Sequence, residues 1–575
     1  MILQALTQLY QDLADRGDIA RRGWSVASIG YVLCLSEDGT LTQAVPLYHE
    51  EQAGKKTVLR PRKMELPAAV TRSSGVVPNF LWDNSSYILG ADEKGKPERS
   101  RKCFEASAQL HHRLLDGVES IAARAVLAFF DCWQPESARL HPALSDCWED
   151  LMKGANLVFR VDGRFVQEDA DVQAAWDAHY GRSEGEKVQC LVTGRLDVPE
   201  PVHPLIKGVA GAQSSGASIV SFNAPAFCSY GKEQSLNAPV GKYAAFAYTS
   251  ALNHLLADRD NVQRIGDATV VCWAEGAEPV YQKFACAALF GAPPPKQITT
   301  DNLRAIVKRL ADHQPCAELN LDPGRNFYIL GLSPNAARLS VRFFYRNSFG
   351  DLMWNINEHH ERMRIVGRQF EYIPLWAMLR ETVNLNSRDK SPSPILAGAT
   401  ASAIFSNQPY PAALLEATML RIRAERQITP GRAAILKAYY LRNRNPLCPE
   451  EVLHVSLNEN STNIPYTLGR LFAVYEAVQE QANPGINATI KDKYFNSAAS
   501  IPATIFPILD NLCPKHLRKL NPKLRVYFDK QIAQLKDVFG ETYPIRLTLP
   551  EQGSFNLGYY HQKQARYNKK EETEE

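Results

Sequence analysis

Three short motifs approach known patterns of catalytic chemistry, and the first lies in a segment rich in glycine and serine. Gly211 and Gly216 have the spacing of the phosphate-binding loop G-x-x-x-x-G-K-[ST], and Ser218 stands where its magnesium-binding hydroxyl would fall. The position that needs a lysine to neutralise a triphosphate holds Ala217 instead. The segment is therefore not predicted to bind a nucleotide.

The other two motifs are also incomplete. Ser229 and Lys232 match S-x-x-K, a motif of acyl-enzyme chemistry, but no K-T-G segment follows them. His360 and Glu361 begin the zinc-protease motif H-E-x-x-H, but Arg364 occupies its closing position. The 11 cysteines include no C-x-x-C pair, so the sequence predicts no zinc site. We therefore expect no catalytic residue, no metal and no cofactor, and we predict that the protein is not an enzyme.

Positive charge is concentrated in two segments of a chain whose net charge is only +3. The first segment is a predicted loop stiffened by Pro61, and its cations are Lys55, Lys56, Arg60, Arg62 and Lys63. The second lies near the C-terminus, and its predicted DNA-contacting cations are Lys515, Arg518, Lys519, Lys523 and Arg525. Clustered cations bind a nucleic-acid backbone without reading its sequence. A solvated helix face is an equally good interpretation of the second segment, where Tyr527 and Phe528 lie among the cations. The cations of the first segment are open to the same alternative, a solvated surface without a nucleic-acid partner.

Two polar segments hold side chains that suit the edges of DNA bases. Amides and hydroxyls both donate and accept hydrogen bonds, and small residues let the backbone enter a groove. The minor groove presents mostly purine N3 and pyrimidine O2 acceptors. The predicted motif-reading residues are Arg72, Ser73, Asn79, Gln213, Ser214, Ser215, Asn223 and Lys232. The alternative is that these residues only satisfy turns and loop backbone, as such residues commonly do.

The elements that position these residues divide the chain into two parts. Helical and strand-like patterns alternate over residues 1–385, which predicts an α+β region. A hairpin is predicted around Gly39, and a buried strand is predicted at 268–275. Residues 386–398, rich in Pro and Ser, are the predicted linker. Residues 399–575 are nearly all helical in pattern and predict a C-terminal helical bundle.

The composition sets the broad class of protein. With 575 residues, of which 45% are hydrophobic and 22% charged, the chain is long enough for roughly two to four globular domains. No apolar run approaches the roughly 18 residues that span a bilayer, and the N-terminus has the pattern of an amphipathic helix, not of a signal peptide. The scattered cysteines suit a reducing compartment, so we expect a cytoplasmic protein.

Five stretches of the sequence resemble one known family. They run in order between about residue 70 and residue 568 and read RSSGVVPNFLWDNSSYILG, GAQSSGASIVSFNAPAFCSYGKEQSLNAPVG, YILGLSPNAARLSVRFF, LGRLFAVYEAVQEQANPGINATIKDKYFNSAASIPATIFPIL and FNLGYYHQKQAR. On these stretches the chain resembles the large subunit of the type I-C CRISPR Cascade surveillance complex. The resemblance extends over most of the chain and is independent of periodicity and spacing.

The resemblance implies a ribonucleoprotein complex that recognises a protospacer-adjacent motif (PAM) in double-stranded target DNA. Its expected partners are the guide RNA, a repeated backbone subunit, a subunit holding the 5′ end of the guide, a small subunit translated from within the same gene, and a helicase-nuclease. The family's large subunit promotes unwinding, so that the guide pairs with one strand in an R-loop, and it helps to recruit the helicase-nuclease. Its C-terminal helical part resembles a Cascade small subunit.

The roles of individual residues are our own inference. The cations of the first segment are expected to hold duplex phosphates, and those of the second to guide the displaced strand or follow the guide–target duplex. Two other classes of function stay open. One is a stand-alone nuclease or nucleotide-dependent enzyme, and the other is a nonspecific nucleic-acid binder that acts alone. The missing lysine of the phosphate loop and the lack of a recognisable metal cluster in the sequence count against the enzyme.

Overall fold

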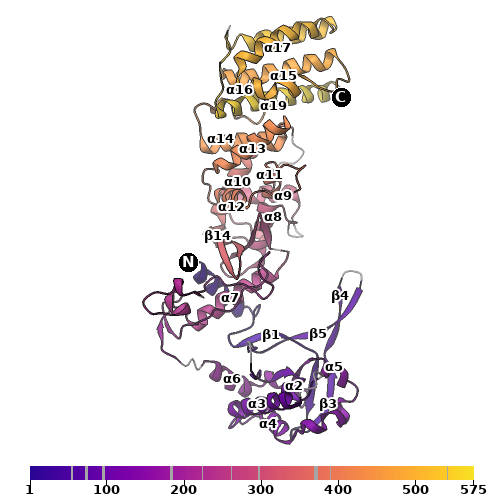
Figure 1. The fold of residues 1–575 in the computed structure, drawn as a ribbon, viewed down its shortest axis with the longest axis vertical. Coiled ribbons are helices and arrows are strands. Elements are labelled where there is room, and N and C mark those ends of the chain that lie inside the picture. Colours follow the sequence, from indigo (N-terminus) through magenta and orange to yellow (C-terminus); the bar gives the residue numbers. More distant parts are fainter. Residues whose placement is uncertain are drawn as a thin grey trace. The chain divides into compact units, whose positions relative to one another are not determined.

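The chain folds into two compact units (Figure 1). The computed structural model describes residues 1–53, 56–70, 75–92, 97–181, 185–222, 224–260, 262–294, 298–367, 373–388, 390–540 and 542–574. The first unit comprises Leu3–Pro204 and Phe222–Ala251, and the second comprises Leu205–Ser221 and Leu252–Glu575. Helix α7 (Lys242–Ala257) carries the chain from the first unit into the second.

The first unit is built around a mixed sheet with the strand order β3-β2-β7-β6 and with β8 paired to β7. Strands β2 and β7 run parallel, and the other pairs are antiparallel. The strands are β2 (Tyr31–Leu35), β3 (Leu41–Pro46), β6 (Trp82–Asn84), β7 (Asn156–Val161) and β8 (Arg164–Phe165), and a separate pair is formed by β9 (Val188–Gln189) and β10 (Leu196–Asp197). The hairpin of β2 and β3 confirms the turn predicted around Gly39, whose φ of 84° suits glycine. The helices of this unit are α1 (Ile2–Asp15), α2 (Ser85–Ile88), α3 (Pro97–Leu115), α4 (Ile121–Cys132), α5 (Trp148–Met152) and α6 (Ala170–Gly181).

The basic segment predicted as a loop is a β-strand. Strand β5 (Lys56–Pro67) pairs antiparallel with β4 (Tyr48–Ala53) as far as Pro61, and with β1 (Trp24–Ile29) from Arg62 onward. Pro61 has no N–H to donate to a partner strand, and it stands where β5 changes partners. The loop prediction was wrong because charged residues and a proline obscure the strand pattern, while the strand is defined by its pairing partners.

The second unit begins with an antiparallel sheet. Its strands follow in the order β11 (Gln263–Ile265), β12 (Ala268–Ala274), β13 (Asn326–Asn335) and β14 (Arg338–Ser348). Every residue of β12 is buried, which confirms the strand predicted at 268–275. The helices that follow or flank this sheet are α8 (Pro279–Phe290), α9 (Thr300–Ala311), α10 (Phe349–Met363) and α11 (Leu375–Arg380).

From residue 394 onward the chain is nearly all helical, as the sequence predicts. The helices are α12 (Pro394–Phe405), α13 (Ala412–Glu425), α14 (Pro430–Asn443), α15 (Ile464–Ala482), α16 (Ile490–Ser500), α17 (Pro502–Leu517), α18 (Pro522–Lys536) and α19 (Leu549–Glu574). Figure 1 shows α13 and α14 between α10 and the group formed by α15, α16, α17 and α19. Together with the sheets, these helices confirm the predicted α+β fold. In the described part of the chain, no helix is long and apolar enough to cross a bilayer.

The predicted linker at 386–398 lies within the second unit. Its last residues form the beginning of α12, because Leu396 and Ala397 are buried in the same hydrophobic core as residues of β12. That core includes residues from Ile265 to Tyr560. A C-terminal domain that starts at residue 399 and folds by itself stays a prediction.

A buried histidine supports an uncommon backbone conformation in the first unit. Leu81 is fully buried at a φ of 64°, which few residues other than glycine adopt. Its N–H donates to Nε2 of His111 (2.9 Å), whose Nδ1–H donates to the carbonyl of Ser107 (2.7 Å). Burial beside the rings of Phe80 and Phe130 lowers the pKa of His111 to about 4, so the imidazole is neutral at pH 7.

We expect the first unit to lose stability as the pH falls from 6.5 to 4. The pKa of His111 in the folded protein lies below the ordinary value of 6.5, so the unfolded chain binds the proton more tightly in this window. A shift of this size corresponds to about 3 kcal/mol of unfolding free energy. This contribution is fully present above pH 6.5 and is lost as the pH approaches 4.

Thermal unfolding at several pH values tests this expectation. The His111→Gln variant should show a shallower pH dependence than the wild type between pH 6.5 and 4. The matched control is His112→Gln, on the same helix, where the side chain is 35% exposed and contacts Asp116 and Asp131. An unchanged slope in His111→Gln, or an equally shallow slope in the control, would contradict the assignment.

Candidate nucleic-acid interface

The segment rich in glycine and serine forms a loop that is fixed at its base. We call residues 207–216 the tip loop. It lies between Ile206 and Ala217, whose backbones exchange two N–H···O=C bonds of 2.9 Å. Within the loop, the Ala210 N–H donates to Oγ1 of Thr269 (3.0 Å). Because Thr269 belongs to the buried strand β12, the loop is attached directly to the sheet.

Glycines at two positions allow the shape of the tip loop. Gly211 has a φ of 79°, and a Cβ there would lie 3.2 Å from Cγ of Pro334, at the end of β13. Gly216 has a φ of 110°, and a Cβ there would lie 2.8 Å from Cβ of Leu205. Any other residue would strain the backbone at both positions. The spacing of Gly211 and Gly216, which resembles that of a phosphate-binding loop, is therefore explained by the backbone conformation and close packing of this turn.

The end of the tip loop presents three polar side chains to solvent. Gln213, Ser214 and Ser215 are all exposed, and the Gly216 N–H closes the turn by donating to the Gln213 carbonyl (2.9 Å). Within the described part of the chain, none of the three side chains has a hydrogen-bond partner. One amide and two hydroxyls are therefore free, on a rigid base, to contact another molecule.

Lys232, a further predicted motif-reading residue, belongs to the first unit. It is exposed in a turn that Asn237 ties together, since Nδ2 of Asn237 donates to the Lys232 carbonyl (3.0 Å) and Oδ1 accepts from the Ser229 N–H (2.8 Å). In the same turn Tyr230 is 99% exposed, at a φ of 54°. Sequence reasoning missed Tyr230, although the glycine that follows it signals a turn.

The polar segment that contains Asn79 is held by buried contacts. Asn79 is only 5% exposed, its side-chain oxygen accepts from the Val70 N–H (2.9 Å), and its own N–H donates to Oδ2 of Asp83 (2.9 Å). Asn79 therefore helps to fix this segment, and little of its side chain is accessible, while its role in motif reading stays a prediction. The predicted site residues outside the described part of the chain are Lys55, Arg72, Ser73 and Asn223, and of Lys56 only the backbone is described.

Strand β5 carries the described cations of the first basic segment on both faces. Arg60 and Arg62, two residues apart, share one face, and Lys63 lies on the other. All three side chains are exposed. Nε of Arg60 lies 2.8 Å from a carboxylate oxygen of Glu51 on β4, and the guanidinium of Arg62 lies 5.8 Å from the ring centre of Phe165. Glu51 therefore partly neutralises Arg60, which leaves Arg62 and Lys63 as the more available cations.

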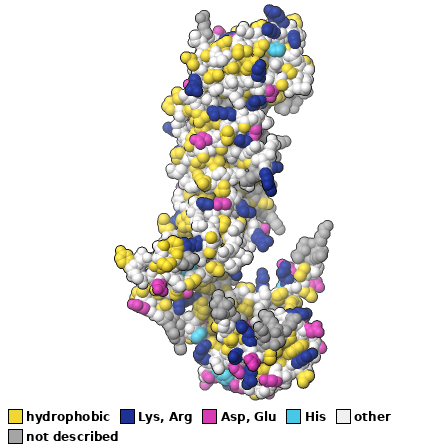
Figure 2. Space-filling model, viewed as in Figure 1, with side chains coloured by type: hydrophobic (Ala, Val, Ile, Leu, Met, Phe, Trp, Pro, Cys, Tyr) yellow, Lys and Arg dark blue, Asp and Glu magenta, His cyan; other side chains and the backbone are white. Residues whose placement is uncertain are grey.

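The second group of cations gathers where α17 turns into α18. Lys515 lies in the last turn of α17, Arg518 follows its end, and positive charge is favourable there because of the helix dipole. Nζ of Lys519 donates to Oδ1 of Asn483 (2.9 Å). We call the exposed residues Lys515, Arg518, Lys519 and Lys523 the basic corner. Figure 2 shows Lys and Arg side chains on these C-terminal helices, near the position where Figure 1 labels α17.

The cations of helix α18 lie on different faces of that helix. Lys523, Tyr527 and Lys530 share one face, because they are spaced at i, i+4 and i+7. Arg525 lies on another side of the helix, where its Nε is 3.7 Å from a carboxylate oxygen of Asp529. Arg525 therefore does not belong to the basic corner, although the sequence groups it with the other cations.

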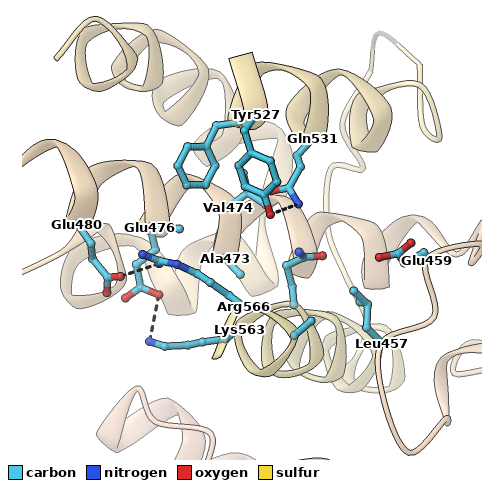
Figure 3. Close-up of a pocket in the computed structure, with 14 residues that line it drawn as sticks. Leu457, Glu459, Ala473, Val474, Glu476, Glu480, Tyr527, Gln531, Lys563 and Arg566 are labelled. Carbon is cyan, nitrogen blue, oxygen red and sulfur yellow. Dashed lines mark hydrogen bonds and ion pairs between the residues drawn. The ribbon is translucent and has the colours of Figure 1, made fainter. Parts of the chain in front are cut away.

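The two aromatic residues of α18 differ in exposure. Phe528 is only 4% exposed, whereas Tyr527 is 45% exposed. Figure 3 shows the Tyr527 ring at the edge of a pocket lined by α15, α18 and α19, where Gln531 donates to its hydroxyl (3.1 Å). The two cations of this pocket are paired with acids, Lys563 with Glu476 (3.5 Å) and Arg566 with Glu480 (3.0 Å), and Glu459 adds a third acid to the lining. The basic corner, not the pocket, therefore offers the available positive charge of this region.

The sequence matches one protein family over residues 6–567, and that family is described as CRISPR-associated protein (Cas_Csd1). The match includes the tip loop, strand β5 and the basic corner. None of the curated proteins searched matches the chain. Because the family match extends over nearly the whole sequence, the chain belongs to the CRISPR-associated Cas_Csd1 family.

Proposed function

We propose that this chain is the large subunit of a type I-C CRISPR Cascade and is not itself an enzyme. It recognises the PAM in duplex DNA, helps the guide RNA to open the duplex into an R-loop, and contributes to the recruitment of the helicase-nuclease. The observation that carries the proposal is the tip loop. This rigid turn exposes one amide and two hydroxyls in a member of a CRISPR-associated family.

The tip loop is suited to reading base edges in a groove. The side-chain amide of Gln213 both donates and accepts hydrogen bonds, and the hydroxyls of Ser214 and Ser215 do either. Their donors match the purine N3 and pyrimidine O2 acceptors of the minor groove. Because the loop is held in place before DNA arrives, little conformational entropy is lost on binding. A short motif is then read with few contacts.

Opening the duplex beside the motif costs free energy that other contacts offset. Stacking contributes about 1.4 kcal/mol for each base-pair step. Tyr230 is almost fully exposed, two residues before the exposed Lys232, so its ring is free to stack on an unpaired base. Arg62, Lys63 and the basic corner hold phosphates. Pairing with the guide RNA supplies the long-range specificity.

Strand opening in the assembled complex tests the proposal. Cascade is reconstituted from guide RNA, the partner subunits and this chain, and unpaired thymines beside the motif are detected by permanganate reactivity. We expect opening of a guide-matched duplex that bears the motif, and little opening without the motif or without this chain. Equal opening in the absence of this chain would contradict the proposal. Cleavage of plasmid DNA by the isolated chain with magnesium and ATP would favour a nuclease.

Replacing Lys519 and Lys523 by alanine should weaken DNA binding without changing the sequence preference. Each lost phosphate contact reduces the slope of log affinity against log salt concentration by about 0.7 on single strands and about 0.9 on duplex. We therefore expect the slope to fall by about 1.4–1.8 on motif-bearing and motif-free DNA alike. Fluorescence anisotropy at several salt concentrations measures both quantities.

The matched control replaces two exposed lysines elsewhere, Lys102 on α3 and Lys283 on α8. This double variant should keep the affinity and the salt slope of the wild type. If the variant in Lys519 and Lys523 also kept the wild-type slope, the basic corner would be a solvated helix end without a role in DNA binding.

A further inference from the structure

A second pocket in the second unit lies outside every surface assigned to motif reading or phosphate binding. It is lined by β11 and the following Gly266, by Phe290 of α8, by α11 and by residues 390–392, and its cavity has a volume of about 280 Å³. This volume is near the lower end of the range for small-ligand sites. Phe290 and Leu379 contribute apolar surface to the lining.

The described residues of the pocket carry positive charge. Its lining includes Arg264, Arg380 and Lys390, all exposed, and none of the described lining residues is an aspartate or glutamate. None of the three cationic groups is paired with another side chain in the described part of the chain. Asp267, close to Arg264 in the sequence, lies 2.6 Å from a guanidinium nitrogen of Arg342. Three unpaired cations around one cavity suit the binding of phosphate groups.

The same pocket offers an exposed aromatic surface. Trp376 is 57% exposed, while Leu375, Met378 and Leu379 of the same helix are buried and fix that helix to the core. An indole held in this way loses little freedom when a flat ring stacks on it. Stacking of a base on an aromatic side chain contributes about 1–3 kcal/mol and tolerates any base. A flat ring linked to phosphates would therefore satisfy both the tryptophan and the cations.

We propose that this pocket binds one nucleotide of a single-stranded nucleic acid. Its base stacks on Trp376, and its neighbouring phosphates contact Arg264, Arg380 and Lys390. The apolar lining packs against the base or sugar without hydrogen bonds specific to one base, so binding is independent of sequence. The strand is one released when the duplex opens, and in this respect the inference rests on the proposed function.

Binding of fluorescein-labelled oligothymidine of 12 nucleotides to the full chain tests this inference. We expect Trp376→Ala to weaken binding by about 5- to 150-fold, the equivalent of the stacking free energy, and Trp376→Phe to retain most of the affinity. The matched control is Trp354→Ala, because Trp354 is 45% exposed on α10 of the same unit and does not line the pocket. No loss in Trp376→Ala, or equal losses in Trp376→Ala and the control, would overturn the inference.

Charge and competitor experiments identify the ligand. The Arg264→Ala/Arg380→Ala variant should reduce the salt slope on oligothymidine by about 1.4. Unlabelled oligothymidine should displace the labelled strand at far lower nucleotide concentration than thymidine monophosphate does. Equal displacement by the mononucleotide would indicate a site for free nucleotides, and displacement by a polyglutamate peptide would indicate a protein-docking site. Either result would overturn the inference.

A parallel measurement separates this inference from the proposed function. Motif-dependent strand opening is measured for complexes that contain the wild type or Trp376→Ala. If the proposed function fails, the wild-type complex does not open motif-bearing duplex. If only the pocket inference fails, the wild-type complex opens the duplex, and Trp376→Ala still binds oligothymidine with wild-type affinity.

Discussion

Replacing Gly558 by valine is expected to lower the midpoint of thermal unfolding of the C-terminal helices by about 6–12 °C. Helices α15 and α19 meet through two glycines. A Cβ at Gly558 would overlap the main-chain carbonyl of Tyr466, and a Cβ at Gly469 would overlap that of Phe555. Main chain within a helix cannot move aside as a flexible side chain does. We expect a loss of about 3 kcal/mol from this overpacking.

Gly398→Ala is the matched control for this substitution. Gly398 lies inside α12, and a Cβ there would meet no atom within 4 Å. Alanine should therefore preserve the structure and raise stability by about 0.5–1 kcal/mol, because glycine in a helix interior is destabilising. Circular dichroism at 222 nm follows both variants. The expected loss of stability implies a much larger shift of the midpoint than about 1 °C. A midpoint for Gly558→Val within about 1 °C of the wild-type midpoint would therefore contradict the close contact of α15 and α19.

Replacing Gln213 by alanine is expected to remove most of the preference for motif-bearing DNA. A side chain that reads a base edge contributes about 1–3 kcal/mol, so binding to motif-bearing duplex should weaken by about 5- to 150-fold. The affinity for motif-free duplex should change by less than about twofold, because contacts with the phosphates supply that affinity. Titration of the assembled complex with both duplexes measures the two affinities.

Gln4→Ala controls for the loss of an exposed amide. Gln4 is exposed on α1, and its side chain has no hydrogen-bond partner in the described part of the chain. This variant should bind both duplexes as the wild type does. Equal losses of Gln213→Ala on both duplexes would assign Gln213 to phosphate binding or loop structure.

Elements with a clear internal pattern could be predicted from the sequence. The buried strand β12 is a continuous apolar run, and helices such as α15 carry apolar residues at helical spacing over many turns. Strand β5 lacks such a pattern, because Arg60, Pro61 and Arg62 interrupt it. Its conformation depends on pairing with β4 and β1. Such pairing is a tertiary effect that local residue types do not reveal.

The candidate site could be predicted only in part for the same reason. The glycines of the tip loop marked an irregular turn, and the structure places Gln213 at its exposed end. The burial of Asn79 depends on contacts with Val70 and Asp83 that its residue type does not predict. The pocket around Trp376 brings together four segments that are separate in the sequence. Neither feature has a local sequence signal.

A photo-crosslink from the tip loop is the most direct test of motif reading. The Ser214→p-benzoylphenylalanine variant keeps Gln213, and its complex with guide RNA is irradiated on duplex DNA that bears the motif. We expect crosslinks at the base pairs of the motif, and we expect them to disappear when the motif is replaced. Crosslinks spread evenly along the DNA, or no crosslink to DNA at all, would contradict the account.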